Sequence, residues 1–174
     1  MGNSKPSTNR NQIQPPPGVR VKFILLRHYW WVLGAALTGF VIYGLFWGLD
    51  LDVLLPILAA ILSALYFLQK QKLEELKTFR EIFEACNKRY DKLNDALDKI
   101  YSVSEGSLSE DERHLLGDYF NLCAEEYLYF SRGYIYPEVW DAWYNGMKFY
   151  LKNPRIMGFW SQESSTNSHY GLHF

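Results

Sequence analysis

Two long apolar runs, separated by a short acidic turn, dominate the pattern of hydrophobic and polar positions. Residues 29–49 (YWWVLGAALTGFVIYGLFWGL) carry no formal charge, and residues 53–68 contain Ser63 as their only strongly polar side chain. At about 1.5 Å per residue, a helix over the first run is roughly 31 Å long, which matches a bilayer core of about 30 Å. The pattern predicts a transmembrane helical hairpin over residues 29–68, preceded by a polar, basic N-terminal arm over residues 1–28.

The charges that flank the two runs predict how the hairpin is oriented. The arm carries five basic side chains and no acidic one, whereas the turn between the runs holds Asp50 and Asp52. Lysines follow the second run at positions 70, 72 and 77. Because positively charged flanks stay on the cytoplasmic side, we expect an integral membrane protein in the lipid bilayer, with both termini in the cytoplasm.

Each apolar run also contains small residues, which allow two helices in a bilayer to approach closely. The sequence leaves open whether they pack the two helices of the hairpin together or join two copies of the chain in a homo-oligomer. The residues predicted to pack the membrane helices are Ala35, Gly39, Gly44, Ala60, Ser63 and Ala64.

From residue 73 to residue 101, apolar positions follow a heptad spacing without glycine or proline. No helix breaker lies between residues 68 and 73, so the second membrane helix is expected to continue into this segment. Such a seam forms a coiled coil with a second copy or packs against later helices of the same chain. Its bulky aromatic residues favour the intrachain bundle. The seam consists of Leu76, Phe79, Phe83, Cys86, Tyr90, Leu93, Leu97 and Ile100.

Helix start and stop signals divide the chain beyond residue 101. Ser109 and Glu112 fit a capping box, in which two side chains satisfy free N–H groups at a helix start. Gly133 is suited to end that helix, and Pro137 is suited to begin the next. The dipeptide Asn153-Pro154 is expected to end the last long helix.

These signals predict an all-α protein with a cytoplasmic helical bundle over residues 69–160. Residues 155–160 resemble a short apolar return segment at the end of this bundle. Residues 161–174 are expected to form a polar C-terminal tail that is mobile unless it is bound, because few of its residues could be buried.

Aromatic residues are unusually dense between positions 119 and 160. One interpretation is that they fill the core of a small bundle, with tyrosine hydroxyls reaching the surface. The other is a face that binds a protein partner, since tyrosine and tryptophan are enriched at interface centres. The residues assigned to this hypothetical partner-binding face are Tyr129, Tyr134, Tyr136, Trp140, Trp143 and Tyr144.

The charge balance and the cysteine content exclude several classes of protein. Residues 69–174 carry 13 basic and 17 acidic side chains, a balance of −4, so direct nucleic-acid binding is not expected. The two cysteines, Cys86 and Cys123, lie within helical patterns and are interpreted as reduced core residues.

No pattern of residues indicates catalysis or cofactor binding. The sequence has no phosphate-binding loop, dinucleotide-binding turn or nucleophile elbow. His169 and His173 have a spacing that suits metal ligands, but no cysteine or acidic pair lies nearby to complete a site. The prediction is a protein that is not an enzyme and has no metal or cofactor.

The stretch DYFNLCAEEYLYFSRGYIYPEVWDAW, residues 118–143, resembles a region of small uncharacterised bacterial membrane proteins. With the two-helix hairpin, the chain is also similar in architecture to two-span effectors of bacterial anti-phage systems, including those that accompany retrons. The resemblance implies location in the bacterial inner membrane and damage to that membrane once a cytoplasmic partner releases the protein.

Three functions therefore remain open. The first is a membrane-anchored effector or regulatory subunit whose helical head is controlled by a protein partner. The second is a non-enzymatic tether or accessory subunit of a larger membrane complex, and the third is a membrane-bound enzyme acting on lipid or peptide.

Overall fold

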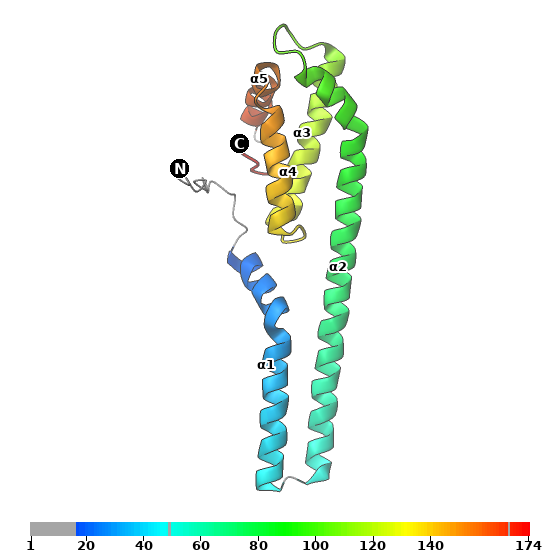
Figure 1. Cartoon of the computed structure of the whole chain (residues 1–174), viewed down its shortest axis with the longest axis vertical. Helices are drawn as coiled ribbons and strands as arrows, with labels where there is room; N and C mark the ends of the chain where they lie inside the picture. The colour runs from blue at the N-terminus through cyan, green and yellow to red at the C-terminus, as the bar shows by residue number, and fades with distance from the viewer. Residues whose placement is uncertain (1–16, 49, 167) are drawn as a thin grey trace, which may run out of the picture. The chain divides into compact units, whose positions relative to one another are not determined.

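The computed structural model describes residues 17–48, 50–166 and 168–174, and within these ranges the chain is all-α (Figure 1). Several side chains between residues 18 and 54 lie outside this description. The described residues form two compact units, a hairpin unit (residues 17–94) and a head unit (residues 95–174). The elements are α1 (Pro17–Trp47), α2 (Leu51–Tyr101), α3 (Glu110–Ser131), α4 (Pro137–Tyr150), α5 (Pro154–Glu163) and the 3₁₀ turn η1 (Ser164–Thr166).

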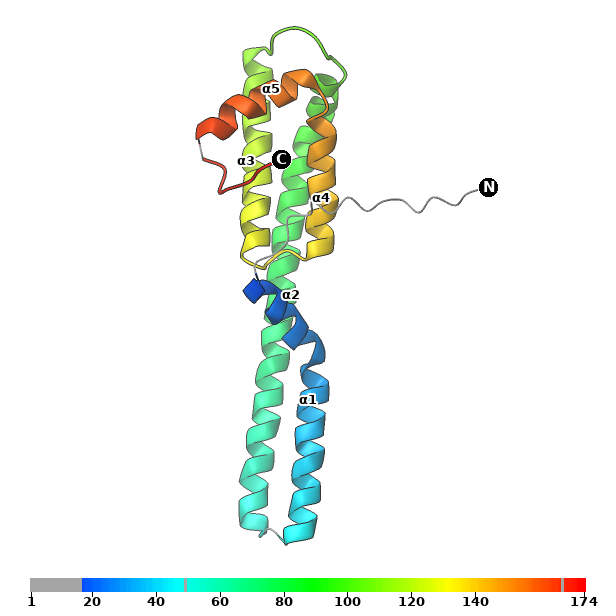
Figure 2. The ribbon, with the colours of Figure 1, turned by 90° about the vertical axis from the view of Figure 1, so that its left-hand side faces the viewer.

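In the hairpin unit, α1 and the first part of α2 lie side by side and antiparallel (Figures 1 and 2). Residues 17–28, predicted to be part of a polar arm, are helical instead. Pro17 takes the first helical position, where its missing N–H costs no hydrogen bond. The rest of the predicted arm, residues 1–16, lies outside the described residues. At the other end of α1, Gly48 has a φ of +63° and donates its N–H to the Gly44 carbonyl. This left-handed glycine ends the helix before the turn.

The helix α2 is continuous over its 51 residues, which confirms the prediction that the second apolar run continues into the heptad seam. Pro56 lies inside α2, close to its start at Leu51. Burial of the seam increases along the helix: Leu76 is 42% exposed, whereas Leu97 is fully buried. Cys86, in the middle of the seam, is already only 3% exposed, so the seam is part of a protein core from there toward the head end of α2.

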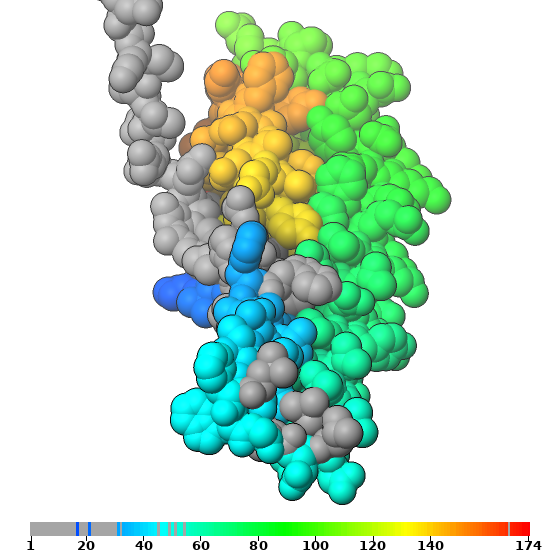
Figure 3. Space-filling view, turned by 60° about the horizontal axis from the view of Figure 1, so that its bottom comes forward, coloured from blue at the N-terminus to red at the C-terminus, as the bar shows by residue number. Residues whose placement is uncertain are grey.

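Large apolar side chains cover the surface of the hairpin unit. Trp31 and Phe46 on α1 are each 80% exposed, and Leu62 and Tyr66 on α2 are 64% and 69% exposed. The turn end of the hairpin comes forward in Figure 3, where side chains of the second half of α1 (cyan) form much of the visible surface. Among the helices in the described part of the chain, none combines the length and the apolar character that crossing a membrane requires.

The small residues predicted to pack the membrane helices are mostly on the outside of the single chain. Gly44 is half-buried, and a Cβ atom added at Gly39 would meet nothing within 4 Å. Hence Gly39 is not a point of close helix approach within the chain, and of the two alternatives for these residues, packing within the hairpin does not account for Gly39. The remaining members of the set, all exposed, are Ala35, Ala60, Ser63 and Ala64.

The head unit contains the end of α2 together with α3, α4 and α5 (Figure 2). The capping box is present as predicted: the Ser109 side chain accepts from the Glu112 N–H, and the Glu112 carboxylate accepts from the Ser109 N–H. Gly133, with a φ of +77°, follows α3, and Pro137 begins α4. The predicted cysteines are both free and buried. Other fully buried core residues include Leu116, Phe120, Leu122, Phe130, Ile135, Trp140 and Ile156.

The predicted polar tail is instead packed against the head, which corrects the expectation of a mobile segment. Helix α5 extends beyond the predicted return segment to Glu163, and η1 follows it directly. Leu172 is 2% exposed, and Phe174 stacks on Tyr144 with ring centroids 5.5 Å apart. Leu172 is therefore buried in the folded head, and Phe174 packs on aromatic rings of the head.

Candidate protein-binding site

The centre of the head is a stack of aromatic rings around Trp140 on α4. The Trp140 ring is fully buried and lies parallel to Phe130 of α3, with centroids 5.0 Å apart and an interplanar angle of 11°. Tyr127 and Tyr144 flank it, each with a centroid distance of 5.6 Å. Offset aromatic contacts of this kind add to the stabilisation that comes from burial alone.

This geometry divides the six aromatic residues predicted to bind a partner. Trp140 is fully buried and Tyr144 is 9% exposed, so both belong to the core and not to an exposed face. The hydrophobic periodicity of α4 could not distinguish core positions from exposed ones, because aromatic residues occupy more than one side of the helix. Tyr134 is 48% exposed in the loop before α4. The other three, all half-buried, are Tyr129, Tyr136 and Trp143.

Aromatic rings of α3, α4 and α5 surround the last described segment of the chain, and we call the surface formed by Phe120, Tyr144 and Trp160 the aromatic cleft. We call residues 168–174 the strap; it returns from the end of α5 across the head (Figure 2). The Phe174 ring contacts Tyr144, Trp160 and Phe120, with centroid distances of 5.5, 5.0 and 6.5 Å. The His169 ring stands edge-on to Trp160 at 4.9 Å and is 6% exposed. The strap therefore occupies the aromatic cleft in the manner of a bound peptide.

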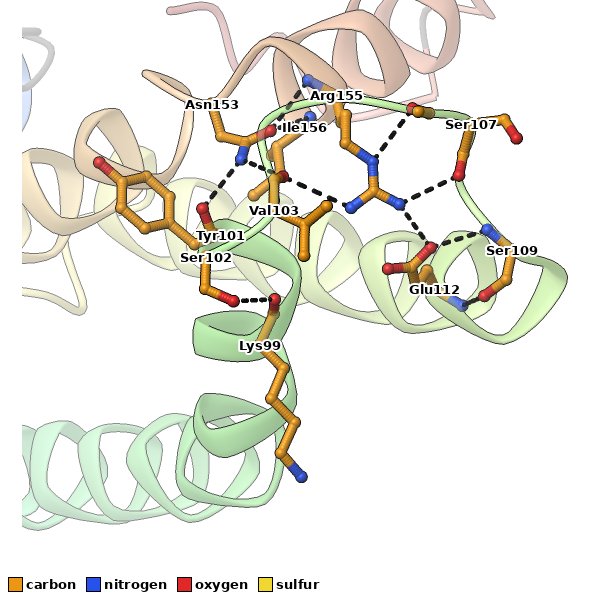
Figure 4. Close-up of polar contacts among 11 residues, drawn as sticks. Lys99, Tyr101, Ser102, Val103, Ser107, Ser109, Glu112, Asn153, Arg155 and Ile156 are labelled. Atoms are coloured by element: carbon orange, nitrogen blue, oxygen red, sulfur yellow. Dashed lines mark hydrogen bonds and ion pairs between the residues drawn. The ribbon is translucent and has the colours of Figure 1, made fainter.

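Asn153 links α5 to the end of α2 through both halves of its side-chain amide (Figure 4). Its oxygen accepts hydrogen bonds from the N–H groups of Arg155 and Ile156, at 2.9 and 3.3 Å, and so caps the start of α5. Its nitrogen donates to the carbonyls of Tyr101 and Val103, at 3.0 and 2.8 Å. One buried side chain thus satisfies backbone groups of two helix ends that are far apart in the sequence.

Arg155 fixes the loop between α2 and α3 from the other side (Figure 4). Its side chain is only 7% exposed, and its guanidinium donates to the Glu112 carboxylate at 2.7 Å. It also donates to the carbonyls of Gly106 and Ser107, at 3.2 and 3.1 Å. Because a buried guanidinium needs several acceptors, this set of contacts gives the loop one defined conformation.

The same contacts lower the pKa of the Glu112 carboxyl below its ordinary value of 4.5. The main cause is the hydrogen bond from the Ser109 backbone N–H, and the Arg155 guanidinium adds to it against the opposing effect of burial. A carboxyl with a lowered pKa in the folded state stabilises the fold above the unfolded-state value, and this contribution is lost as the pH falls through the folded-state pKa.

We therefore expect that, below pH 4.5, the stability of the head depends less on pH in Glu112→Gln than in the wild type. The free energy of unfolding of the head should fall less steeply with acidification in this variant than in the wild type. Urea titrations at a series of pH values measure the difference. Glu110→Gln, at an exposed carboxylate of the same helical turn, is the matched control, and a Glu112→Gln curve parallel to the wild-type curve would contradict the assignment.

A shallow polar groove of about 330 Å³ lies between α3 and α5. The Arg113 guanidinium covers the Phe159 ring on its floor, 5.4 Å from the ring centroid. Carboxylates outnumber basic groups around the groove, so it suits a basic side chain better than an anion. Its lining residues are Glu110, Arg113, His114, Gly117, Asp118, Asn121, Phe159 and Glu163.

Two observations on the head bear on thiol chemistry and on metal binding. Burial, with the nearby Glu126 charge, raises the pKa of the Cys123 thiol well above its ordinary value of 9.0. Cys123 is therefore a thiol at neutral pH and not a reactive thiolate. Within the part of the chain that the structure describes, no three His, Cys, Asp or Glu side chains are grouped as ligands for a metal ion.

Sequence reasoning missed Asn153, Arg155 and the two apolar residues of the strap as determinants of this architecture. An asparagine before a proline, followed by apolar positions at 156, 159 and 160, is the signature of a capped helix with proline at its first position. That signal could have identified α5. No local signal pairs Arg155 with Glu112 or places Phe174 on Tyr144, because these contacts depend on the tertiary fold.

No protein-family model, curated protein or solved structure matches this chain significantly.

Proposed function

We propose that this chain is a membrane-anchored, non-enzymatic effector or regulatory subunit whose helical head is controlled by a protein partner. The observation that carries the proposal is the exposed apolar surface of the hairpin unit. Residues such as Trp31, Phe46 and Leu62 are 80%, 80% and 64% exposed. Soluble monomers rarely expose apolar surface on this scale, whereas a bilayer solvates it.

Two further features, the small residues of the hairpin and the continuity of α2, support the same proposal. Gly39 and its small neighbours are open at the surface, which suits contact with lipid or with a second hairpin. The helix α2 joins the hairpin unit to the head without a break, so a change in the head has a continuous element through which to act. In this proposal the hairpin lies in the inner membrane, the head lies in the cytoplasm, and release by the partner lets the hairpins assemble and disturb the membrane.

Membrane anchoring is tested by placing one lysine at two positions of α2. Leu62 and Leu73 are 64% and 66% exposed, so either change should leave a water-soluble protein almost unaffected. Only Leu62 lies within the apolar run. Leu62→Lys should cost about 3 kcal/mol in a bilayer and strongly reduce the fraction of protein that stays in carbonate-washed membranes. Leu73→Lys is the matched control and should be retained like the wild type. Equal behaviour of the two variants would refute the anchor.

The effector activity is tested separately, by inducible expression of the chain in bacteria with a dye that reports membrane potential. We expect depolarisation by the wild-type chain and its loss in Gly39→Leu. A leucine at Gly39 fits the single chain but blocks the approach of a second one. Gly34→Leu, where the added side chain also meets open space, is the control for leucine in α1. Membrane-bound protein without depolarisation would instead identify a tether.

A further inference from the structure

The strap contacts the head mainly through side chains and hardly through its backbone. Leu172 is 2% exposed, the Phe174 ring lies against Tyr144 and Trp160, and His169 lies against Trp160. Leu172 and Phe174 are two residues apart, so one extended segment can direct both side chains to the same face. The side chains between and before them, at Tyr170 and His173, are exposed.

The hydrogen bonds of the strap are made largely within the strap and to its neighbours in the chain, and not to the head. The Leu172 N–H donates to the His169 carbonyl within the strap, at 2.9 Å. The Ser168 hydroxyl shares hydrogen bonds with Thr166 and His169, which are close neighbours in the chain. From the cleft, the Tyr144 hydroxyl donates a hydrogen bond to the His173 carbonyl of the strap, at 3.3 Å. This bond requires only a carbonyl oxygen, so any extended peptide could accept it.

The turn within the strap also carries backbone strain. Tyr170 and Gly171 both have positive φ angles, +52° and +83°. Together with the bond from Leu172 to His169, they give the turn the φ signature of type I′. Tyrosine is an unfavourable residue at such a position, because its Cβ crowds the neighbouring carbonyl in the left-handed region. Release of the strap relieves this strain, whereas the capped helices of the head gain nothing by opening.

We infer that the strap is an internal ligand of the aromatic cleft, and that the controlling partner displaces it with a peptide segment of the same chemistry. That segment is extended and presents an aliphatic residue and an aromatic residue separated by one position. The cleft selects this pattern because Phe120, Tyr144 and Trp160 surround the ring of Phe174. The inference rests on the proposed function in that it assumes a protein partner for the head.

The test uses the full chain in detergent micelles and the heptapeptide SHYGLHF, residues 168–174, blocked at both ends and labelled with a fluorophore. Leu172→Ser combined with Phe174→Ala weakens the chain's own strap and leaves the cleft intact. We expect the peptide to bind this double variant at least tenfold more tightly than it binds the wild-type chain. A peptide in which leucine and phenylalanine are replaced by serine is the matched probe and should not bind.

Equal affinity of the peptide for the two chains, or absence of binding to a folded double variant, would overturn the inference. If the double variant does not fold, hydrogen exchange on the wild-type chain decides. The Leu172 amide should then exchange much faster than the Phe120 amide of α3, because the strap opens without unfolding of the head. Similar protection of the two amides would refute the inference. Neither readout requires a membrane. If the head binds the peptide but the chain does not enter membranes, only the proposed membrane anchor is refuted.

Discussion

Replacing Trp140 by alanine is expected to destabilise the head by about 3–5 kcal/mol, the range for removal of a fully buried large aromatic side chain. Trp140 is the largest fully buried residue, and its ring contacts Phe130, Tyr127 and Tyr144 from α3 and α4. Its removal would leave a cavity where these helices meet. Since native domains are stable by about 5–15 kcal/mol, this loss would remove a large share of the free energy of unfolding of the head.

Two companion variants separate the causes of this effect. The Trp140 indole N–H is buried and has no hydrogen-bond partner among the described residues, so its desolvation opposes folding, and Trp140→Phe removes that cost. Trp140→Phe keeps a ring against Phe130 and should cost about 1–2 kcal/mol, less than the alanine change. Tyr134→Ala, at a side chain that is 48% exposed, should stay within about 0.5 kcal/mol of the wild type. Hydrogen exchange at the α3 amides gives the three free energies. If Trp140→Ala were as stable as Tyr134→Ala, the assignment of Trp140 to the core would be contradicted.

Local sequence signals predicted those parts of the fold that depend on neighbouring residues. The capping box of Ser109 and Glu112, the left-handed Gly133 and the initial Pro137 each act within a few positions, and each lies where it was predicted. The continuity of α2 followed from the absence of glycine and proline between the second apolar run and the seam. Backbone conformation at such positions is decided by local sterics and hydrogen bonding, so tertiary context changes it little.

Predictions that depended on distant contacts were less successful. Trp140 and Tyr144 were assigned to a partner-binding face, but in the structure they belong to the core. Along α4, aromatic residues at 140, 143 and 144 look alike to a periodicity argument, and only the positions of α3 and the strap decide which of them is covered. The strap itself was expected to be mobile, because its polar average concealed Leu172 and Phe174. Average composition measures the apolar surface available, but not whether a matching surface exists elsewhere in the fold.

The second large effect is expected for Asn153→Ala, which should destabilise the head by about 2–4 kcal/mol. Loss of the helix cap at the start of α5 costs about 1 kcal/mol. The rest comes from the two hydrogen bonds that the amide nitrogen donates to the Tyr101 and Val103 carbonyls. Asn153 is 4% exposed, so alanine leaves the Tyr101 carbonyl without this donor at a buried site, whereas the Val103 carbonyl keeps the Arg155 guanidinium as a donor at 3.5 Å. The free energy of unfolding, measured by hydrogen exchange at the amides of α5 and α3, reports the loss.

Asn153→Asp distinguishes the cap from the link to α2, because aspartate can accept from the N–H groups of Arg155 and Ile156 but cannot donate to the two carbonyls. If both functions matter, aspartate should recover about 1 kcal/mol of the alanine loss through the cap and no more. Full recovery would mean that the hydrogen bonds to Tyr101 and Val103 contribute nothing. An aspartate variant less stable than the alanine variant would mean that a carboxylate facing these carbonyls is worse than a missing donor. In that case the junction between α2 and α5 depends on the neutral amide, which alone can accept on one side and donate on the other.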